Sequence, residues 1–460
     1  MGMVNIGLSG VLANRVALNT TAQNTANVNT PGYSRQLVNF EATSSGNYVN
    51  GVNLGAGVDV DSVLRVAEQS SINRLRQAIE KANYAQSYFD GLSNIENVLS
   101  ADGLNLTEGF NLFFAAIDEA SVTPEDSAFR QQVLTNADAL AQQFNALASQ
   151  LEQQEAANSE RYEALVTSIN SDLKNISDLN QKLNEEALLG NSVAGLQDTM
   201  DRYLNALSES IDIKMIYTDT GTVELSTPNG QPLVVGGYTA SLSRDLSNGD
   251  PNSTELNITF QSVTLPIDAE LGGEVGAIAA LKSEQFDPIR TKLNDLTKAF
   301  ADGVNAVLIS GFDLNGNVGR PLFTYNIGSE ASSIAIDPNL TARELAFSSD
   351  PLLAGNGDKL KELSTLSQAT FAVGTVAGQT PYSAYSGLLG EVGIWTRQAE
   401  NEALSSTISM EDAQVARDSI SAVNSDEEAA NMVLYLNAYE ANMKVISTAN
   451  QMFQTLLQAF

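Results

Sequence analysis

The side chains in this sequence that could do chemistry are mostly carboxylates, and one group of them has a metal-like spacing. The run Asp313-Leu-Asn-Gly-Asn317 resembles the opening of a calcium-binding loop. However, the sixth position is Val318 where such a loop needs glycine, and the twelfth is Thr324 where it needs glutamate. A turn is therefore the better interpretation of this run.

Two carboxylate pairs, Asp59/Asp61 and Glu427/Glu428, are the other candidates for acid–base chemistry. Neither pair follows the sequence pattern of an apolar pocket. The second pair lies at a predicted helix start, where acids are favoured because they complement the helix dipole. Trp395 is the only tryptophan, and a position in a core or at a domain junction is its simplest role. These residues predict no active site.

The absence of two residue types excludes whole classes of function. The 460-residue chain contains no histidine and no cysteine. It therefore lacks an imidazole base, a His-ligated metal, a thiolate nucleophile, a disulfide and a zinc or iron–sulfur site. We expect no catalytic residues, no metal and no cofactor, and we expect that the protein is not an enzyme.

The net charge limits the possible partners. The chain has 24 basic and 55 acidic residues, a formal net charge of −31. This balance predicts no nucleic-acid binding, which needs clustered lysine and arginine. The sequence contains no run of 18 apolar residues, so we expect no membrane insertion as a helix. The first 23 residues do not have the pattern of a cleaved signal peptide.

Charge is sparse at both ends of the chain. Residues 1–34 contain a single charged side chain, Arg15, and residues 441–460 contain only Lys444. Charged side chains normally mark surface exposed to solvent. The two ends are therefore predicted to be buried against other surfaces, while the acidic middle of the chain faces solvent.

The middle of the sequence contains a long helical pattern. Residues 125–189 include no glycine or proline, and their apolar residues recur at steps of three and four. This pattern predicts a rod-like helix with coiled-coil-like packing, with a possible break near 155–159. A similar pattern runs from Ile72 to Phe89.

The C-terminal segment has the most regular apolar stripe. Residues 425–428 read as a helix-capping box, and the stripe continues to the last residue in steps of three and four. Asn450 interrupts it with a polar side chain, which can fix the register of packed helices. The predicted C-terminal seam consists of Met432, Leu436, Tyr439, Met443, Ile446, Asn450, Phe453, Leu457 and Phe460.

The N-terminal segment offers a partner for this stripe. A helix is predicted to end before Asn29-Thr-Pro-Gly32, which is a strong helix breaker. Pairing the first helix with the last would place both chain ends in one layer. The predicted N-terminal seam consists of Val4, Leu8, Val11, Leu18 and Ala22.

Between the helical flanks the apolar period changes to two. Segments within 211–268 are rich in β-branched residues and separated by turn signals, which predicts a small antiparallel β insertion. Helix is predicted again over 275–309 and 358–421. The fold class is therefore mainly α, a long helical rod built from both chain ends with a β insertion. The predicted domains are 1–60 with 411–460 (inner tube), 61–210 with 269–410 (rod), and 211–268 (β-rich projection).

One N-terminal motif resembles a known family. Leu8-Ser-Gly10, Leu18-Asn19 and the run from Asn24 to Gln36 resemble the motif shared by bacterial flagellar rod, hook and hook-associated proteins. Ser34-Arg-Gln36 and the stretch 421–428 resemble the subunits of the junction between hook and filament. The residues that we assign to the assembly motif are Asn24, Asn27, Thr30, Pro31, Gly32 and Tyr33.

The resemblance implies a mechanical role. In this family the terminal helices pair into an inner tube and the other domains project outward. The implied protein is exported unfolded by the flagellar type III apparatus, assembles with copies of itself, and joins the hook protein to the second hook-associated junction protein. An export chaperone is implied for the C-terminal helix. The compact β region and the short 311–357 segment indicate that an outer domain of longer relatives is absent.

Two alternatives remain at this point. The chain could be another flagellar axial protein, such as a hook, distal rod or second junction subunit, because terminal motifs discriminate poorly within the class. It could also be a carboxylate-based glycosidase with an acidic pair in the β insertion. No acidic pair stands out there, and a long rod makes a poor cleft.

Overall fold

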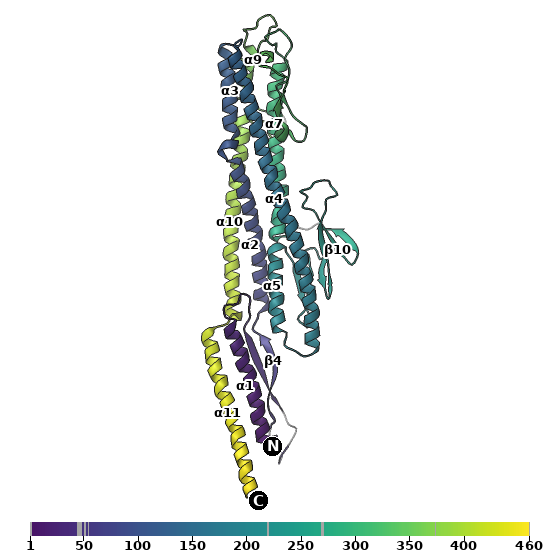
Figure 1. Cartoon of the computed structure of the whole chain (residues 1–460), viewed down its shortest axis with the longest axis vertical. Helices are drawn as coiled ribbons and strands as arrows, with labels where there is room; N and C mark the ends of the chain where they lie inside the picture. The colour runs from purple at the N-terminus through teal and green to yellow at the C-terminus, as the bar shows by residue number, and fades with distance from the viewer. Residues whose placement is uncertain are drawn as a thin grey trace.

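The computed structural model is an elongated, mainly helical molecule with both chain ends at one end of it (Figure 1). It describes residues 2–43, 48–49, 52–53, 55–218, 220–267, 271–372 and 374–459. Long helices occur at both ends of the sequence, and the described strands form small antiparallel sheets. The predicted fold class is confirmed.

The longest helix, α4 (Ser127–Leu188), contains 62 residues. At 1.5 Å per residue it extends about 90 Å. It begins where the Asp126 carboxylate accepts a hydrogen bond from the backbone N–H of Ala128 at 2.8 Å. The sequence allowed a break near residues 155–159, but the helix continues through them. No proline or glycine interrupts its backbone hydrogen bonds there, so polar residues alone do not end it.

The helices packed alongside α4 complete the rod. Helix α2 lies against α10 along the rod, and α3 and α5 lie against α4 (Figure 1). The predicted helix over 358–421 is interrupted between α9 and α10, where Gly374 and Gly378 have φ of +75° and +79°. The bounds of these helices are α2 Gln69–Leu99, α3 Leu106–Val122, α5 Ala194–Ser210, α6 Gly273–Ala280, α7 Asp287–Ile309, α8 Glu330–Ser333, α9 Asp358–Thr365 and α10 Pro381–Ser421.

Two hydrophobic cores follow one another along the rod. The upper core surrounds α4 from Val133 to Leu151 and includes residues of α2, α3, α7, α9 and α10. Its centre is an aromatic cluster in which the Phe300 ring lies 5.1 Å from that of Phe110 and 5.5 Å from that of Phe113. The lower core surrounds α4 from Tyr162 to Leu183 and includes α5, α6 and the β insertion.

The predicted β insertion contains seven described strands. They form a four-stranded sheet of order β5-β6-β7-β8 and a three-stranded sheet of order β11-β10-β9. These sheets project from the side of the rod (Figure 1). The strands are β5 Lys214–Tyr217, β6 Val223–Ser226, β7 Pro232–Val235, β8 Tyr238–Thr239, β9 Ser241–Arg244, β10 Leu256–Phe260 and β11 Val263–Pro266.

Further strands occur outside the insertion. The sequence analysis did not predict the long hairpin of β1 (Gln36–Thr43) and β4 (Gly57–Arg65), which carries the shorter pair β2 (Tyr48–Val49) and β3 (Val52–Asn53). We call β1 and β4 the arm. A two-residue pair, β12 (Phe323–Thr324) and β13 (Ala335–Ile336), lies in the upper core. The arm falls across residue 60, where the sequence analysis placed a domain boundary.

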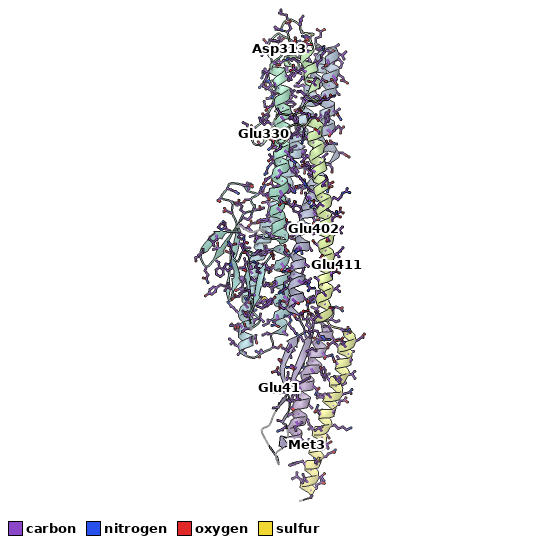
Figure 2. All side chains as sticks on the ribbon, turned by 180° about the vertical axis from the view of Figure 1, so that it is seen from behind. Met3, Glu41, Asp313, Glu330, Glu402 and Glu411 are labelled. Carbon is purple, nitrogen blue, oxygen red and sulfur yellow. The ribbon has the colours of Figure 1, made fainter. Side chains whose placement is uncertain are left out.

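The terminal helices form a separate unit at the lower end. Helix α1 (Gly2–Ala26) lies beside α11 (Ser425–Gln458), and α11 reaches beyond the start of α1 (Figure 1). Met3, near the start of α1, and Asp313 lie at opposite ends of the molecule (Figure 2). Helix α10 passes through the predicted boundary at residue 411, and the helical path breaks at residues 422–424.

Candidate assembly site

The contact between α1 and α11, which we call the terminal hairpin, is made through small side chains. The buried face of α1 includes Gly7, Gly10, Ala13 and Ala17. The Asn442 side chain of α11 occupies the space where a Cβ of Gly10 would lie. A Cβ at Gly7 would lie 2.8 Å from Cγ1 of Ile446. The two helix backbones can therefore approach closely, because glycine leaves room for the facing side chains.

The predicted N-terminal seam is not the face that α11 covers. Of its five residues, only Val11 is buried, while Leu8 and Ala22 are exposed. Most of the predicted seam is therefore not buried within the single chain, and its role in assembly stays a prediction. Large side chains between α1 and α11 would hold the two helix backbones apart. The small-residue face of α1 therefore forms this contact, and Leu8 faces away from it.

The predicted C-terminal seam is also largely open to solvent in the single chain. Met432, Leu436, Met443, Phe453 and Leu457 are exposed, with Phe453 and Leu457 each at 63%. Asn450 is exposed as well, so it sets no register within this chain, while Tyr439 and Ile446 are partly buried. Phe460 lies outside the described residues. Of the described α11 residues, Glu428 and Ala449 are the buried ones.

Exposed apolar side chains therefore gather on both helices of the hairpin. We call this set the apolar terminal surface. A protein surface rarely exposes so many large apolar groups together unless another surface covers them. It consists of Met3, Ile6, Leu8 and Leu12 on α1 and of Met432, Val433, Leu434, Leu436, Met443, Met452, Phe453, Leu456 and Leu457 on α11.

The predicted assembly motif forms the turn that follows α1. The buried Asn24 side chain donates from Nδ2 to the Gln36 carbonyl at 2.9 Å and accepts from the Gln36 N–H at 3.0 Å. Its Oδ1 also accepts from the Tyr33 hydroxyl at 2.9 Å. Asn24 thus closes the chain from the end of α1 to the first residue of β1.

The other motif residues shape this turn. The Asn27 side chain donates to the Gln23 carbonyl at 2.9 Å, and the Thr30 hydroxyl donates to Asn27 Oδ1 at 3.1 Å. Pro31 lies on the exposed part of the turn. Gly32 has φ of +77°, a conformation that glycine adopts at little cost. The motif therefore orders a turn inside the chain, which explains its residue types without a ligand.

The residues after the motif tie the turn to the rod. The Gly32 carbonyl accepts a hydrogen bond from Arg417 of α10 at 3.1 Å, and the buried Ser34 hydroxyl accepts another at 3.3 Å. The Arg35 N–H donates to the Ser421 carbonyl at 2.8 Å, and its guanidinium pairs with Glu427. These bonds join the start of the arm to the place where α10 ends and α11 begins.

A buried charge cluster completes this joint. Arg65 of β4 pairs with Asp198 of α5 at 3.0 Å and also with Asp201. Arg76 of α2, which is 1% exposed, pairs with Asp201 and donates to Asn205 at 3.0 Å. The sequence did not indicate this cluster, because the two arginines lie more than 100 residues from their partners on α5 and the two groups share no pattern.

Burial shifts the proton affinity of two groups in the joint. Burial raises the pKa of Asp198, against the opposing effect of Arg65. Burial, with the nearby Asp198 and Glu428 carboxylates, raises the pKa of Tyr33 to about 12. Tyr33 therefore stays protonated at neutral pH and keeps donating its hydrogen bond to Asn24.

The start of α11 differs in detail from the predicted capping box. Asn424 is the N-cap, and its side chain accepts from the backbone N–H groups of Asp426 at 2.9 Å and Glu427 at 3.4 Å. The sequence analysis had placed the cap at Ser425. Both residue types cap helices well, so the choice depends on the backbone turn at 422–424.

The carboxylate clusters have structural roles. The Asp313 carboxylate accepts from the backbone N–H groups of Asn315 and Asn317, both at 2.8 Å, and closes a turn as predicted. Asp59 and Asp61 are exposed on the arm. Within the described residues, no group of three or more acidic residues is placed to hold a metal ion. In the same part of the chain, no helix combines the length and apolar character of a membrane span.

The similarity to known proteins agrees with this architecture. The family model for the flagellar hook-associated protein FlgK helical domain matches residues 92–323, just over half of the chain. The chain belongs to this hook-associated family. A second model, for the C-terminal region of flagellar basal body rod proteins, matches residues 417–459. The resemblance found in the terminal motifs is confirmed.

Individual members of the hook-associated family extend the comparison. Flagellar hook-associated protein 1 of Salmonella typhimurium is 28% identical over 332 residues, covering 71% of this chain. The match spans only 60% of the Salmonella protein. Flagellar hook-associated protein 1 of Bacillus subtilis is 25% identical, and the match covers 97% of this chain and 95% of that protein.

A solved structure shares the fold. The flagellar hook junction protein FlgK from Burkholderia pseudomallei superposes with a TM-score of 0.64 at 16% identity. The superposition covers 76% of this chain and all of that one. At this identity the likeness concerns the fold.

Proposed function

We propose that this chain is a structural subunit of the bacterial flagellum, located at the junction between hook and filament. The observation that carries the proposal is the apolar terminal surface, which the single chain leaves uncovered. Membership of the hook-associated family supports the flagellar setting. The C-terminal match to rod proteins supports a contact that flagellar axial proteins share.

Burial of the apolar terminal surface would drive the assembly. Each large apolar side chain that is fully removed from water contributes about 1.5–3 kcal/mol. Helix α1 carries Arg15 as its one charged residue, so few charges need to be desolvated when copies pack together. We propose that the helices of neighbouring copies cover this surface and form the inner layer of a ring.

The remaining partners follow from the same proposal. The ring would stack on the hook protein on one side and on the second hook-associated junction protein on the other. Before export, a chaperone would cover the apolar face of α11, and the chain would leave the cell through the flagellar export apparatus. The acidic rod and the β insertion would then face the extracellular solvent.

The experiment compares two pairs of substitutions, each of which removes two exposed large apolar side chains. Phe453→Ser with Leu457→Ser removes exposed side chains from α11, whereas Leu188→Ser with Leu189→Ser removes side chains at the end of α4 that are even more exposed. Each variant replaces the native protein in its own bacterium. Isolated hook–basal bodies are imaged by electron microscopy with an antibody against the chain.

We expect that the α11 variant is missing from the hook tip and that cells carrying it form no filaments. The α4 variant should reach the tip and support filaments. Labelling of the native chain at any place other than the end of the hook would refute the junction assignment. Normal filament growth with the α11 variant would refute the role of the terminal surface.

A further inference from the structure

The rod is not uniformly packed along its length. No apolar residue of α4 between Leu151, the last member of the upper core, and Tyr162, the first of the lower core, belongs to either core. The buried positions between them are Glu155 and Ser159, at 5% and 8% exposure. Two successive inward-facing positions of the longest helix are therefore polar.

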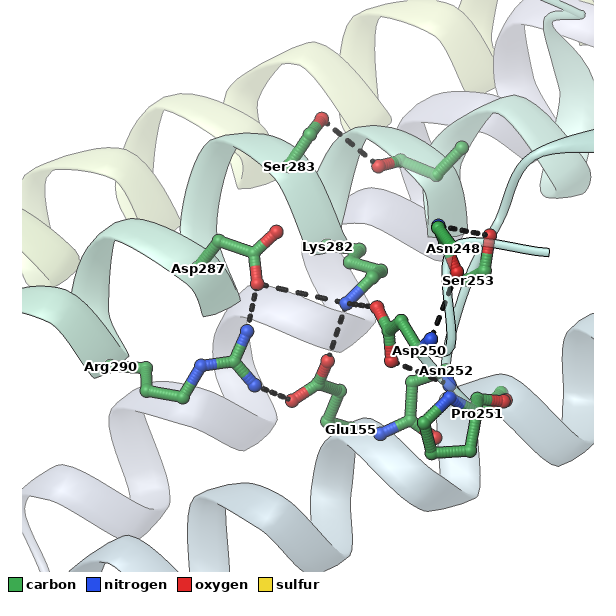
Figure 3. Close-up of polar contacts among 12 residues, drawn as sticks. Glu155, Asn248, Asp250, Pro251, Asn252, Ser253, Lys282, Ser283, Asp287 and Arg290 are labelled. Atoms are coloured by element: carbon green, nitrogen blue, oxygen red, sulfur yellow. Dashed lines mark hydrogen bonds and ion pairs between the residues drawn. The ribbon is translucent and has the colours of Figure 1, made fainter. Parts of the chain in front are cut away.

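Glu155 is held by charged side chains of the neighbouring helical segment. Its Oε1 lies 2.7 Å from Lys282 Nζ, and its Oε2 lies 2.8 Å from Arg290 Nη1. Lys282 also contacts Asp250 at 2.9 Å and Asp287 at 3.6 Å. Figure 3 shows this network between α4, the segment that carries Lys282, and the loop before β10.

Ser159 joins the same loop to α4. The Arg244 guanidinium donates to the Ser159 hydroxyl at 2.9 Å and to the Pro251 carbonyl at 2.9 Å. Arg244 comes from β9, a strand that contributes Leu242 to the lower core. We call the set Glu155, Ser159, Arg244, Lys282 and Arg290 the polar layer.

The helical segment opposite α4 changes its geometry at the same level. Residues Leu281–Phe286 form a π-helical turn between α6 and α7. Single π turns inside longer helices are places where helices bend. Gln285 in this turn donates to the Tyr88 hydroxyl of α2 at 2.7 Å, so polar contacts extend from the π turn to α2 as well.

We propose that the rod bends at the polar layer, so that the upper and lower cores tilt against each other as two stiff bodies. Dispersion contacts between packed apolar atoms lose a quarter to a half of their energy when a gap of about 0.5–1 Å opens. Ion pairs weaken only as the inverse of distance. The long side chains of Lys282 and Arg290 can also follow a moving carboxylate.

The continuous helices keep the two bodies connected during such a tilt. Helices α2, α4 and α10 run past the polar layer without interruption. Long helices curve smoothly at low cost, with radii of about 60–100 Å. The bending is a property of the single chain and holds whether or not the chain forms a flagellar junction.

The absence of cysteine allows a direct test on the full-length chain, because introduced cysteines are the only sites for spin labels. Ala335→Cys with Ser243→Cys places one label on each body. Ala335→Cys with Lys361→Cys keeps both labels on the upper body, and Ser243→Cys with Glu185→Cys keeps both on the lower body. All four positions are exposed. Pulsed electron paramagnetic resonance measures the three distance distributions.

The pair across the polar layer should give a distribution about twice as wide as either pair within one body. Adding Glu155→Leu with Lys282→Met, which replaces the central ion pair of the layer with apolar side chains, should narrow this distribution. Lys298→Met, which removes the exposed Lys298–Asp302 pair within the upper body, should not change it. Equal widths for all three pairs in the unsubstituted background would overturn the proposal, even if the layer variants do not fold.

Discussion

The rod and the terminal hairpin bury different kinds of side chain. In the rod, large apolar groups such as Phe110, Phe113 and Phe300 are inside and contact one another. In the hairpin, glycine and alanine are inside, while large groups such as Leu8 and Phe453 are outside. The rod thus completes its cores within one chain, whereas the hairpin leaves its main apolar burial to another surface.

Under the proposed function, this difference lets one chain be stable alone and still keep an apolar surface free for assembly. The free energy gained from apolar burial is proportional to the area removed from water. The rod buries its large apolar side chains within the chain, so it already has most of this stabilisation. The hairpin gains little from its small-residue contact. The arm, which packs against α1, is held to the rod by the charge cluster around Arg65 and Asp201, and α11 is tied to the start of the arm by the Arg35–Glu427 pair.

The largest change in the free energy of unfolding is expected when a phenylalanine is replaced by alanine in the rod, compared with the same replacement in the hairpin. Phe300→Ala removes the centre of the aromatic cluster and should destabilise the rod by about 3–5 kcal/mol. Phe453→Ala removes an exposed ring from the hairpin and should leave stability unchanged. Urea unfolding followed by circular dichroism measures both. Equal losses would show that the hairpin shares the packing of the rod.

The next effect concerns the small-residue contact. Gly10→Val places two methyl groups where the Asn442 side chain lies and should cost about 1–3 kcal/mol by overpacking. Gly2→Val, on the same helix with open space around it, is the control. Hydrogen exchange should show faster exchange in α1 and α11 for the first variant alone. Unchanged exchange would contradict a close α1–α11 contact.

A pH effect is expected in the rod at Asp313. Burial opposes its ionisation, but hydrogen bonds from the backbone N–H groups of Asn317 and Asn315 are stronger together and keep the pKa of Asp313 below its usual value. Because the folded pKa is lowered, this stabilisation is present above the unfolded pKa and is lost as pH falls through the folded value. Asp313→Asn should flatten the acid side of the stability–pH curve, measured by urea midpoints. An identical curve for the variant would rule out this role.

The smallest effect distinguishes two neighbouring candidates for the α11 cap. Asn424→Ala removes the acceptor for two backbone N–H groups and should cost about 1 kcal/mol of local helix stability. Ser425→Ala should cost much less, because Ser425 is already inside the helix. Hydrogen exchange of the first turn of α11 measures both. A larger effect at Ser425 would restore the cap position that the sequence suggested.

The elements that the sequence predicted best are those defined by local pattern. Helix α1 ends at Ala26, before the predicted breaker at Asn29–Gly32, and α4 closely follows the proline-free stretch 125–189. The arm was not predicted, because the glycine- and asparagine-rich stretch 44–57 reads as turn and separates the two strands that pair, β1 and β4. The exposure of the seam residues in the single chain could not be predicted, because an apolar stripe predicts a buried face without indicating which molecule buries it.

The small-residue contact between α1 and α11 could have been predicted from the sequence. Gly7, Gly10, Ala13 and Ala17 recur at steps of three and four, as the members of one helix face do. The ion pairs that join the arm and α11 to their neighbours could not be predicted. Arg65 contacts Asp201, and Arg35 contacts Glu427, only after segments far apart in the chain come together.

By itself the sequence determined the helical class, the lack of histidine and cysteine chemistry, the sparse charge of the ends and the family motif, because each depends on residue type and short-range spacing. The tertiary structure decided which face of α1 meets α11, where the arm and the polar joint lie, and that a polar layer separates two cores. Those features depend on contacts between residues far apart in the chain, and the free energy of such contacts exists only in the folded arrangement.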